Sequence, residues 1–377
     1  MIKKFLKKIW NRFWRRQDKK LDELKKKVTV LEKKLDEQKK ANQDLKNYIK
    51  QELERRDDWA IRRNELRYLA KGKKIWVIKN PAPATDDKVN WGEYGFYLNV
   101  KEKLEEQGYF VYIDYFDDWK GPIDADYVLI SLAARKYRPD RSVPNCKYFL
   151  WLNCYVDRFD ISECELYDAV LVSSNMYTKK LQEEVSVPVI PFLLCAEADK
   201  FYPEQTEKKY DKVFVGNTRG VKRDCIFWCE DKKIEVDLWG RKEGAFGWAK
   251  RIQENSSIRL HGFLQNDKLP EVFRSSRIIL NDHFEDMKRE GFINLRTIEA
   301  LFCGSAVLSD YHQELEELFG DMIVYYHDEE EFFEKLEWLE THYEEQEQKV
   351  LAKWPEIRDK FSLESRVKEL IQIAEAE

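Results

Sequence analysis

The chain has 377 residues, of which 43% are hydrophobic and 36% are charged, and its formal net charge at pH 7 is -5. A chain of this length and apolar content can bury substantial cores and normally forms two domains rather than one. The negative net charge argues against a dedicated nucleic-acid binder, so we expect no nucleic-acid partner.

The seven cysteines are scattered through apolar segments without a CxxC pair, and their number is odd. This usage is typical of reduced thiols in a cytoplasmic protein. The five histidines do not lie at ligand spacing from the cysteines, so we expect no structural zinc. No apolar run approaches the roughly 20 residues that cross a bilayer, and no signal-peptide core is present at the N-terminus.

Residues 1–16 combine seven Lys or Arg residues with apolar side chains at helical spacing. The apolar side chains are Ile2, Phe5, Leu6, Ile9, Trp10, Phe13 and Trp14. This pattern predicts a basic amphipathic helix on an anionic membrane, which would make the protein peripheral on the inner face of the plasma membrane. The alternative is a helix that packs on the body of the protein.

Residues 17–70 carry a heptad pattern over about four repeats. The a positions are Leu21, Val28, Leu35, Asn42 and Ile49, and the apolar d positions are Leu24, Leu31 and Leu45. The pattern predicts a coiled coil, parallel and homo-oligomeric, about 50 Å long. The alternative is a long monomeric helix docked on the globular part.

Residues 73–200 alternate apolar runs with helical or loop segments. We expect strands at 73–79, 109–116, 126–132, 147–153, 169–174 and 187–192, and a helix from about Phe96 to Gln107. Strands that alternate with helices predict a parallel, doubly wound sheet. The charged segment 196–212 is expected to be a linker.

Residues 208–345 repeat the pattern. We expect strands at 212–217, 235–240, 258–264, 277–282, 305–310 and 323–327, followed by C-terminal helices over residues 346–377. The predicted fold is therefore α/β, with two Rossmann-like domains, a cleft between them and a coiled-coil helix in front.

The segment 278–310 is expected to form a strand, a polar loop, a helix that begins near Asn294, and a second strand. Ligands bind at the carboxyl ends of parallel strands, and a helix N-terminus there suits a phosphate. Arg296 can pair with a phosphate as a fork, and Glu299 can accept from two ribose hydroxyls. The segment predicts a site for a nucleoside diphosphate.

Several segments, in the same order, resemble GT-B glycosyltransferases, in particular the CgeB-like branch of group 1. They are WGEYGFYLNVKEKLEEQGY, WLNCYVDRFDISECELYDAVLVSSNMYTKKL, the 278–310 segment and ELEELFGD, within residues 75–345. The resemblance implies that the C-terminal domain, 208–345, binds a nucleotide sugar and that the N-terminal domain, 73–200, binds the acceptor.

The resemblance also implies roles for three acids. Glu290 and Glu299 correspond to the two acids of the EGF…EA signature, the first near the sugar and the second at the ribose. Eight residues separate them here, where the commonest form has seven. Glu93 replaces the acid of a WGD turn and is the candidate base that activates the acceptor, with Asp157 as the alternative.

The loop after the strand predicted at 212–217 adds candidate residues for donor binding. Gly216 and Asn217 end a predicted strand, and the loop after them offers cations to a diphosphate, where they would stabilise the charge of the leaving nucleotide. A solvated basic loop is the alternative. The predicted donor-binding residues are Gly216, Asn217, Arg219, Lys222, Arg223, Asn294, Arg296, Thr297 and Glu299.

Asp124 and Asp126 spell a DxD motif, but they precede a predicted strand, so turn chemistry explains them better than a metal. We expect no metal and no cofactor. No GxGxxG follows a first strand, which counts against a nicotinamide dehydrogenase.

The favoured hypothesis is a membrane-associated transferase that moves a sugar from a nucleotide-diphosphate donor to a surface polysaccharide or a lipid-linked glycan. The competing hypothesis is a non-enzymatic membrane scaffold whose glycosyltransferase-like domain only binds partners. The three charged residues around one loop, Glu290, Arg296 and Glu299, disfavour the scaffold.

Overall fold

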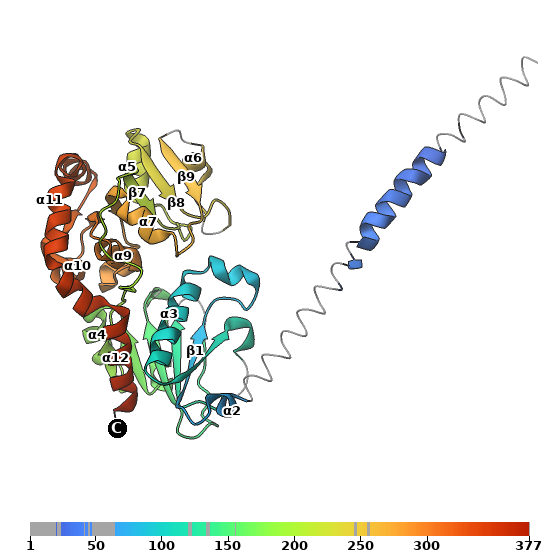
Figure 1. Cartoon of the computed structure of the whole chain (residues 1–377), viewed down its shortest axis with the longest axis horizontal. Coiled ribbons are helices and arrows are strands. Elements are labelled where there is room, and N and C mark those ends of the chain that lie inside the picture. The colour runs from blue at the N-terminus through green and yellow to red at the C-terminus, as the bar shows by residue number, and fades with distance from the viewer. Residues whose placement is uncertain are drawn as a thin grey trace, which may run out of the picture. The chain divides into compact units, whose positions relative to one another are not determined.

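A computed structural model describes residues 20, 24–40, 42–43, 46, 65–119, 123–132, 136–154, 156–244, 247–254 and 257–376. Two units are distinguished, one up to Arg63 and one from Asn64 to the C-terminus. The second unit contains two β-sheets, each at the centre of one lobe (Figure 1).

The N-terminal lobe is built on a six-stranded parallel sheet in the order β2-β1-β3-β4-β5-β6. Its strands are β1 Ile75–Asn80, β2 Phe110–Tyr115, β3 Tyr127–Leu132, β4 Lys147–Leu152, β5 Ala169–Val172 and β6 Val189–Pro191. All six expected strands are present. Every residue of β1 is buried, as expected for a central strand covered on both faces.

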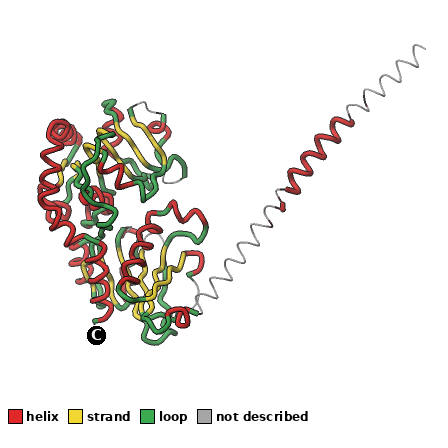
Figure 2. Tube along the Cα trace, in the orientation of Figure 1, coloured by secondary structure: helices red, strands yellow, loops and turns green. Residues whose placement is uncertain are grey.

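Helices cover both faces of this sheet (Figure 2). The helix α3 (Gly92–Glu106) packs Tyr97 and Leu104 on one face, and α2 (Leu66–Ala70) and α4 (Asn175–Gln182) pack on the other. The helix α3 begins four residues earlier than its predicted start at Phe96. Glu93 therefore lies in the first turn of a helix rather than in a loop.

The C-terminal lobe contains a second parallel sheet in the order β12-β11-β10-β7-β8-β9. Its strands are β7 Tyr210–Val215, β8 Val236–Trp239, β9 Ile258–Gly262, β10 Ser276–Asn281, β11 Ala306–Asp310 and β12 Ile323–Tyr326. All six expected strands are again present. The strand β10 is central, since Ile279 pairs with Val213 of β7 and with Val307 of β11.

Eight helices surround or follow this sheet in the described part of the chain. They are α5 Asp224–Asp231, α6 Lys250–Gln253, α7 Leu269–Arg274, α8 Glu285–Glu290, α9 Leu295–Phe302, α10 Gln313–Phe319, α11 Glu329–Phe361 and α12 Leu363–Glu375. The helix α9 starts where the sequence predicts a helix. The helix α8 lies in the segment predicted as a polar loop, and this prediction was wrong because Met287 gives that segment an apolar anchor.

Two segments of the C-terminal half pack on the N-terminal lobe. The helix α12 places Leu363, Val367 and Leu370 in the core beneath α3, so the chain ends beside the first sheet (Figure 1). Met287 of α8 and the adjacent Phe292 enter the other apolar core of the N-terminal lobe. The cores of the two lobes are therefore joined by side chains from the second lobe.

Residues 24–40 are helical and belong to the first unit. The predicted seam positions Leu24, Val28, Leu31 and Leu35 are each at least 50% exposed on the single chain. Residues 1–16, which the sequence predicts as a membrane-association helix, lie outside the described residues, as do parts of the 17–70 segment. None of the described helices combines the length and apolar character that a membrane crossing requires.

Candidate functional site

The helix α9 begins at the carboxyl edge of the second sheet, and Asn294 fixes its first turn. Asn294 Oδ1 accepts hydrogen bonds from the backbone N–H and the hydroxyl of Thr297, both at 3.0 Å. Its Nδ2 donates to Asn281 Oδ1 at 2.7 Å, at the end of β10. Asn294 thus caps the helix and ties it to the strand. Thr297 is buried and serves this cap.

Arg296 and Glu299 lie one turn apart on α9 and form an ion pair through Nη1 and Oε2. Arg296 Nη2 also donates to Asn266 Oδ1 at 3.4 Å. Burial raises the pKa of the Glu299 carboxyl, and Arg296 opposes that rise. An ionised carboxylate accepts hydrogen bonds from neighbouring hydroxyls, and a guanidinium can pair with a phosphate. This pair therefore matches the two polar parts of a nucleotide.

Two arginines of the loop after β7 stack on one aromatic ring. The guanidinium carbons of Arg219 and Arg223 lie 4.4 and 4.2 Å from the ring centroid of Phe284. The ring belongs to the loop after β10, which is the strand beside β7. Arg223 also pairs with the Asp282 carboxylate and donates to the Asp282 carbonyl at 2.6 Å. Two guanidiniums held in this way concentrate positive charge where an anion can bind.

Gly216 and Asn217 shape the loop beneath these arginines. A Cβ on Gly216 would lie 2.8 Å from an aromatic carbon of Phe214, so a larger residue would require the ring to move. Asn217 Oδ1 accepts a hydrogen bond from the backbone N–H of Arg241 at 2.9 Å, which joins the loops after β7 and β8. Both residues thus support the loop through local geometry.

Three adjoining cavities collect most of the residues that the sequence singled out. Cavity I, of about 270 Å³, is lined by seven of them: Glu93, Gly216, Asn217, Arg219, Arg223, Asn294 and Arg296. Cavity II, of about 230 Å³, shares five of these and adds Phe96, Tyr97, Asp282 and Met287, and Phe284 lines both cavities. Cavity III, of about 240 Å³, contains Arg296, Glu299 and Asn266.

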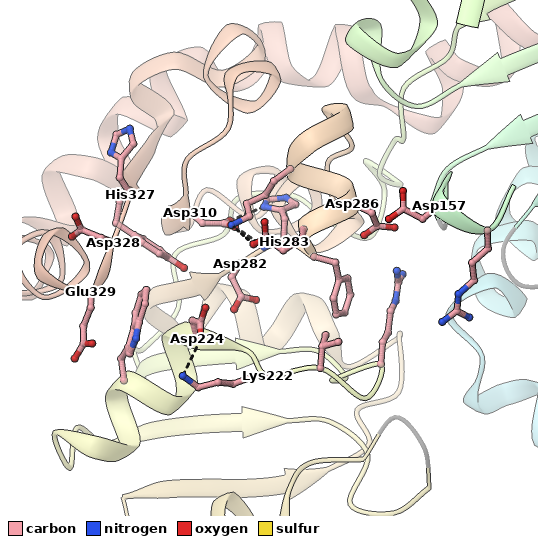
Figure 3. A pocket seen from close by; sticks show the side chains of 18 residues that line it. Asp157, Lys222, Asp224, Asp282, His283, Asp286, Asp310, His327, Asp328 and Glu329 are labelled. Atoms are coloured by element: carbon pink, nitrogen blue, oxygen red, sulfur yellow. Dashed lines mark hydrogen bonds and ion pairs between the residues drawn. The ribbon is translucent and has the colours of Figure 1, made fainter. Parts of the chain in front are cut away.

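A larger space, cavity IV, of about 610 Å³, lies over the carboxyl ends of β10, β11 and β12 (Figure 3). Lys222 lines cavity IV rather than cavity I, and its amine pairs with Asp224 at 3.0 Å. Asp157, from the N-terminal lobe, also lines cavity IV and forms an ion pair with Arg289.

The two candidate bases line different cavities. Glu93 lines cavities I and II together with Arg219 and Arg296. Asp157 lines cavity IV, and its carboxylate forms an ion pair with Arg289, which is not part of the lining. Glu93 therefore shares its cavities with Arg219, Arg223 and Arg296, whereas Asp157 shares cavity IV with Arg219 alone of these three.

Glu290 lies at the C-terminal end of α8 and is not among the residues that line these cavities. Its carboxylate receives Lys180 Nζ at 3.0 Å and Arg289 Nε at 3.1 Å. Its carbonyl accepts a hydrogen bond from Ser174 Oγ at 2.7 Å. Lys180 and Ser174 belong to the N-terminal lobe, so the contacts of Glu290 join the two lobes. Its role at the donor sugar stays a prediction.

A group of buried titratable side chains lies behind the loop after β10. Asp310 Oδ1 is 2.7 Å from His283 Nδ1, and Asp310 Oδ2 accepts the His283 backbone N–H at 2.9 Å. The His312 ring lies edge-on to that of His283, with centroids 4.8 Å apart. Burial lowers the pKa of His312 to about 3.

No three His, Cys, Asp or Glu side chains among the described residues gather in a way that could hold a metal ion. Asp124 and Asp126 of the DxD motif each pair with Arg67 at 2.8 Å. Asp126 also accepts the backbone N–H of Ile75 at 2.7 Å. These contacts give the motif a structural role at the start of β1.

Sequence reasoning missed Phe284, Asp282 and Asn266. Asp282 is the last residue of the predicted strand 277–282, and Phe284 is an aromatic residue in a polar segment, so both carried a weak signal. Asn266 carried no such signal because it follows β9 and meets Arg296 only through the fold.

The comparisons with known proteins agree with this geometry. Residues 223–372 match a protein family described as "Glycosyl transferase-like". The second lobe carries a glycosyl transferase-like domain. No curated protein sequence matches the chain.

Solved structures extend the likeness over both lobes. A glycosyltransferase from Rickettsia africae has a TM-score of 0.61 at 12% identity, covering 80% of this chain and 98% of its own. The sucrose-phosphate synthase of Thermosynechococcus elongatus has a TM-score of 0.56 at 12% identity, covering 80% and 98%. Anabaena HepE, in complex with UDP and glucose, has a TM-score of 0.56 at 8% identity, covering 81% and 100%.

The two parallel six-stranded sheets with their helices thus form the two-lobed GT-B fold. The family match and the fold together support the predicted nucleotide-sugar-dependent transferase.

Proposed function

We propose that the protein transfers a sugar from a nucleoside-diphosphate donor to a hydroxyl group of a glycan. The proposal depends mainly on one observation: Arg219 and Arg223 both stack on the ring of Phe284, beside the Arg296–Glu299 ion pair. Three guanidiniums at a strand edge, of which Arg223 is also paired with Asp282, match a diphosphate, and the Glu299 carboxylate matches a ribose. The complex of HepE with UDP and glucose supports the same ligand class.

Different residues serve the leaving group, the acceptor and the nucleoside. Attack of an acceptor hydroxyl oxygen on the anomeric carbon breaks the bond to the diphosphate oxygen, and that oxygen keeps the electron pair. Arg219 and Arg223 stabilise the charge that develops there. Glu93, which lines cavities I and II, removes the proton of the acceptor hydroxyl. The nucleoside lies in cavities I and III, where Glu299 receives the ribose hydroxyls.

We further propose that the protein belongs to the CgeB-like branch and works at the cytoplasmic face of a membrane, on a surface polysaccharide or a lipid-linked glycan. The basic amphipathic sequence of residues 1–16 supports contact with anionic lipid. The exposed apolar positions Leu24, Val28, Leu31 and Leu35 support a coiled-coil oligomer.

The test measures the melting temperature of the full chain with nucleoside diphosphates, nucleosides and nucleotide sugars. We expect at least one nucleoside diphosphate to raise the melting temperature. When the corresponding nucleotide sugar is incubated with the protein and an acceptor, we expect the same diphosphate to be released. Arg296→Ala and Glu299→Ala should lose both effects, while Arg251→Ala, at an exposed site on α6, should keep them.

Two results would reject this function. One is the absence of binding and turnover with every nucleotide sugar. The other is identical behaviour of Arg296→Ala, Glu299→Ala and the unmodified protein. Partner or glycan binding without a response to any nucleotide would favour the scaffold instead.

A further inference from the structure

The helix of residues 24–40 presents a row of apolar side chains on one face. Leu24, Val28, Leu31 and Leu35 occupy successive d and a positions of the heptad pattern, and they are 58%, 50%, 64% and 52% exposed. Residues three and four apart lie on the same face of a helix, so the four side chains form one continuous seam. In a coiled coil, such a seam is buried by another helix.

Lysines border this seam on both sides. In the same heptad register, the e and g positions from residue 20 to residue 46 carry six lysines, one glutamate and one alanine. The charged residues are Lys20, Lys25, Lys27, Glu32, Lys34, Lys39 and Lys46, all of them helical and exposed. The acids Asp36 and Glu37 lie at b and c positions, away from the seam. The borders of the seam are therefore strongly positive.

The lysines beside the seam are not neutralised within the helix. Lys39 pairs with Asp36 at 3.7 Å, but the two side chains are 68% and 77% exposed, and such a pair is weak. Lys25, Lys27 and Lys34 have no ion-pair partner among the described residues. Their charges are thus available to a second helix.

A second copy of this chain does not match these charges. In a parallel coiled coil, a g residue of one helix faces the e residue of the next heptad on the other. Lys20 would face Lys25, and Lys34 would face Lys39. Of the lysines at g positions, only Lys27 would face an acid. In an antiparallel pair, g positions face g positions, and those at 20, 27 and 34 are all lysine. Like charges along a seam disfavour both arrangements.

We propose that this helix forms a coiled coil with a helix of a different protein that carries Glu or Asp at its own e and g positions. The heptads alone predict a homo-oligomer, whereas the lysines that border them match an acidic partner. The apolar residues of the partner cover the seam, and its carboxylates pair with the lysines. Asn42, at an a position, pairs with a polar residue of the partner and fixes the register. The proposal does not depend on the transferase reaction.

The test measures binding of labelled synthetic peptides to the full chain by fluorescence anisotropy, at about 0.15 M salt. The acidic peptide has about four heptads, with Val at a except for one Asn opposite Asn42, Leu at d, and Glu at e and g. The basic peptide differs only in having Lys at e and g. We expect the acidic peptide to bind at least tenfold more tightly. An acidic peptide of scrambled order should not bind.

Charge reversal beside the seam provides the decisive variant. It combines Lys25→Glu, Lys27→Glu and Lys34→Glu. We expect this variant to bind the acidic peptide at least tenfold more weakly than the unmodified chain, and to bind the basic peptide more tightly. The gain for the basic peptide shows that the altered helix still forms a seam.

A matched control changes the net charge equally on the opposite face of the helix. It combines Lys26→Glu, Lys33→Glu and Lys40→Glu, all at exposed f positions. Because f positions point away from the partner in a coiled coil, this variant should stay within about threefold of the unmodified chain for both peptides.

Three outcomes would overturn the proposal. Equal affinity for the acidic and the basic peptide would remove the charge argument. Equal effects of the two triple variants, or binding of the scrambled peptide, would indicate general charge attraction without a seam. A full chain that sediments as a dimer or larger oligomer and binds no acidic peptide would assign the seam to a second copy of this chain.

Discussion

Glu314 of the C-terminal lobe holds Asn175 of the N-terminal lobe. Glu314 Oε1 accepts the backbone N–H of Asn175 at 2.8 Å and its Nδ2 at 2.7 Å, and Oε2 accepts the Met176 N–H at 2.9 Å. The Glu314 side chain is completely buried. A carboxylate at the start of α4 also favours the helix dipole, so one residue joins the lobes and completes the helix.

Removal of the Glu314 carboxylate should destabilise the contact between the two lobes. Glu314→Ala removes the acceptor of three N–H groups in a partly buried place, so we expect a loss of about 2 to 4 kcal/mol in the free energy of unfolding. Urea denaturation measures it. Glu317→Ala, at an exposed position on the same helix, should cost less than about 0.5 kcal/mol. Equal midpoints for the two variants would contradict the role of Glu314.

Phe284 should act on donor binding through the two arginines. Cation–π contacts contribute about 0.5 to 2 kcal/mol each, so Phe284→Leu should raise the KM for the nucleotide sugar by several-fold or more. Phe284→Tyr keeps the ring and should stay within about twofold of the unmodified protein. Steady-state kinetics over a series of donor concentrations decides this. A KM unchanged in Phe284→Leu would show that the arginines hold their places without the ring.

Glu299→Gln should separate stability from binding. Burial raises the pKa of this carboxyl in the folded chain, so its ionised form at pH 7 opposes folding, despite Arg296. We therefore expect Glu299→Gln to have an equal or higher melting temperature without ligand and a weaker nucleotide-induced shift. Glu271→Gln, in the first turn of α7, is the control. A lower melting temperature for Glu299→Gln would mean that the ion pair outweighs the cost of burial.

His312 should make the fold sensitive to mild acid. Its pKa is about 3 in the folded chain, below the usual 6.5, because burial disfavours the charged ring. The unfolded chain therefore binds a proton that the folded chain rejects, and stability falls as the pH decreases from about 6.5 toward 3. His312→Asn keeps an acceptor at the start of α10, where Nδ1 now accepts the Leu315 N–H at 3.3 Å, and should flatten this slope. Melting curves at pH 7, 6, 5 and 4 test it, and parallel slopes for both proteins would refute it.

Residues 1–16 should attach the protein to anionic lipid. A variant without these residues should remain in the supernatant when sedimented with phosphatidylserine vesicles, while the full chain pellets and is released by added salt. Vesicles of neutral lipid provide the control. Equal pelleting of the two proteins would place membrane contact elsewhere.

The order of elements was readable from the sequence because each depends on neighbouring residues. The apolar residues within Ile75–Asn80 and Ser276–Asn281 identify strands by composition alone. Asn294 could be recognised at the start of α9 because a cap acts within one turn. For the same reason the Arg296–Glu299 pair, three residues apart, could be placed on one helix face.

Tertiary structure alone decided how the site is assembled. The stacking of Arg219 and Arg223 on Phe284 requires β7 to lie beside β10, although the chain places β8 and β9 between them. Glu290 meets Lys180 across 110 residues, and Glu314 meets Asn175 across 139. Such pairs follow from strand order and lobe packing, and no local pattern of residue types records them.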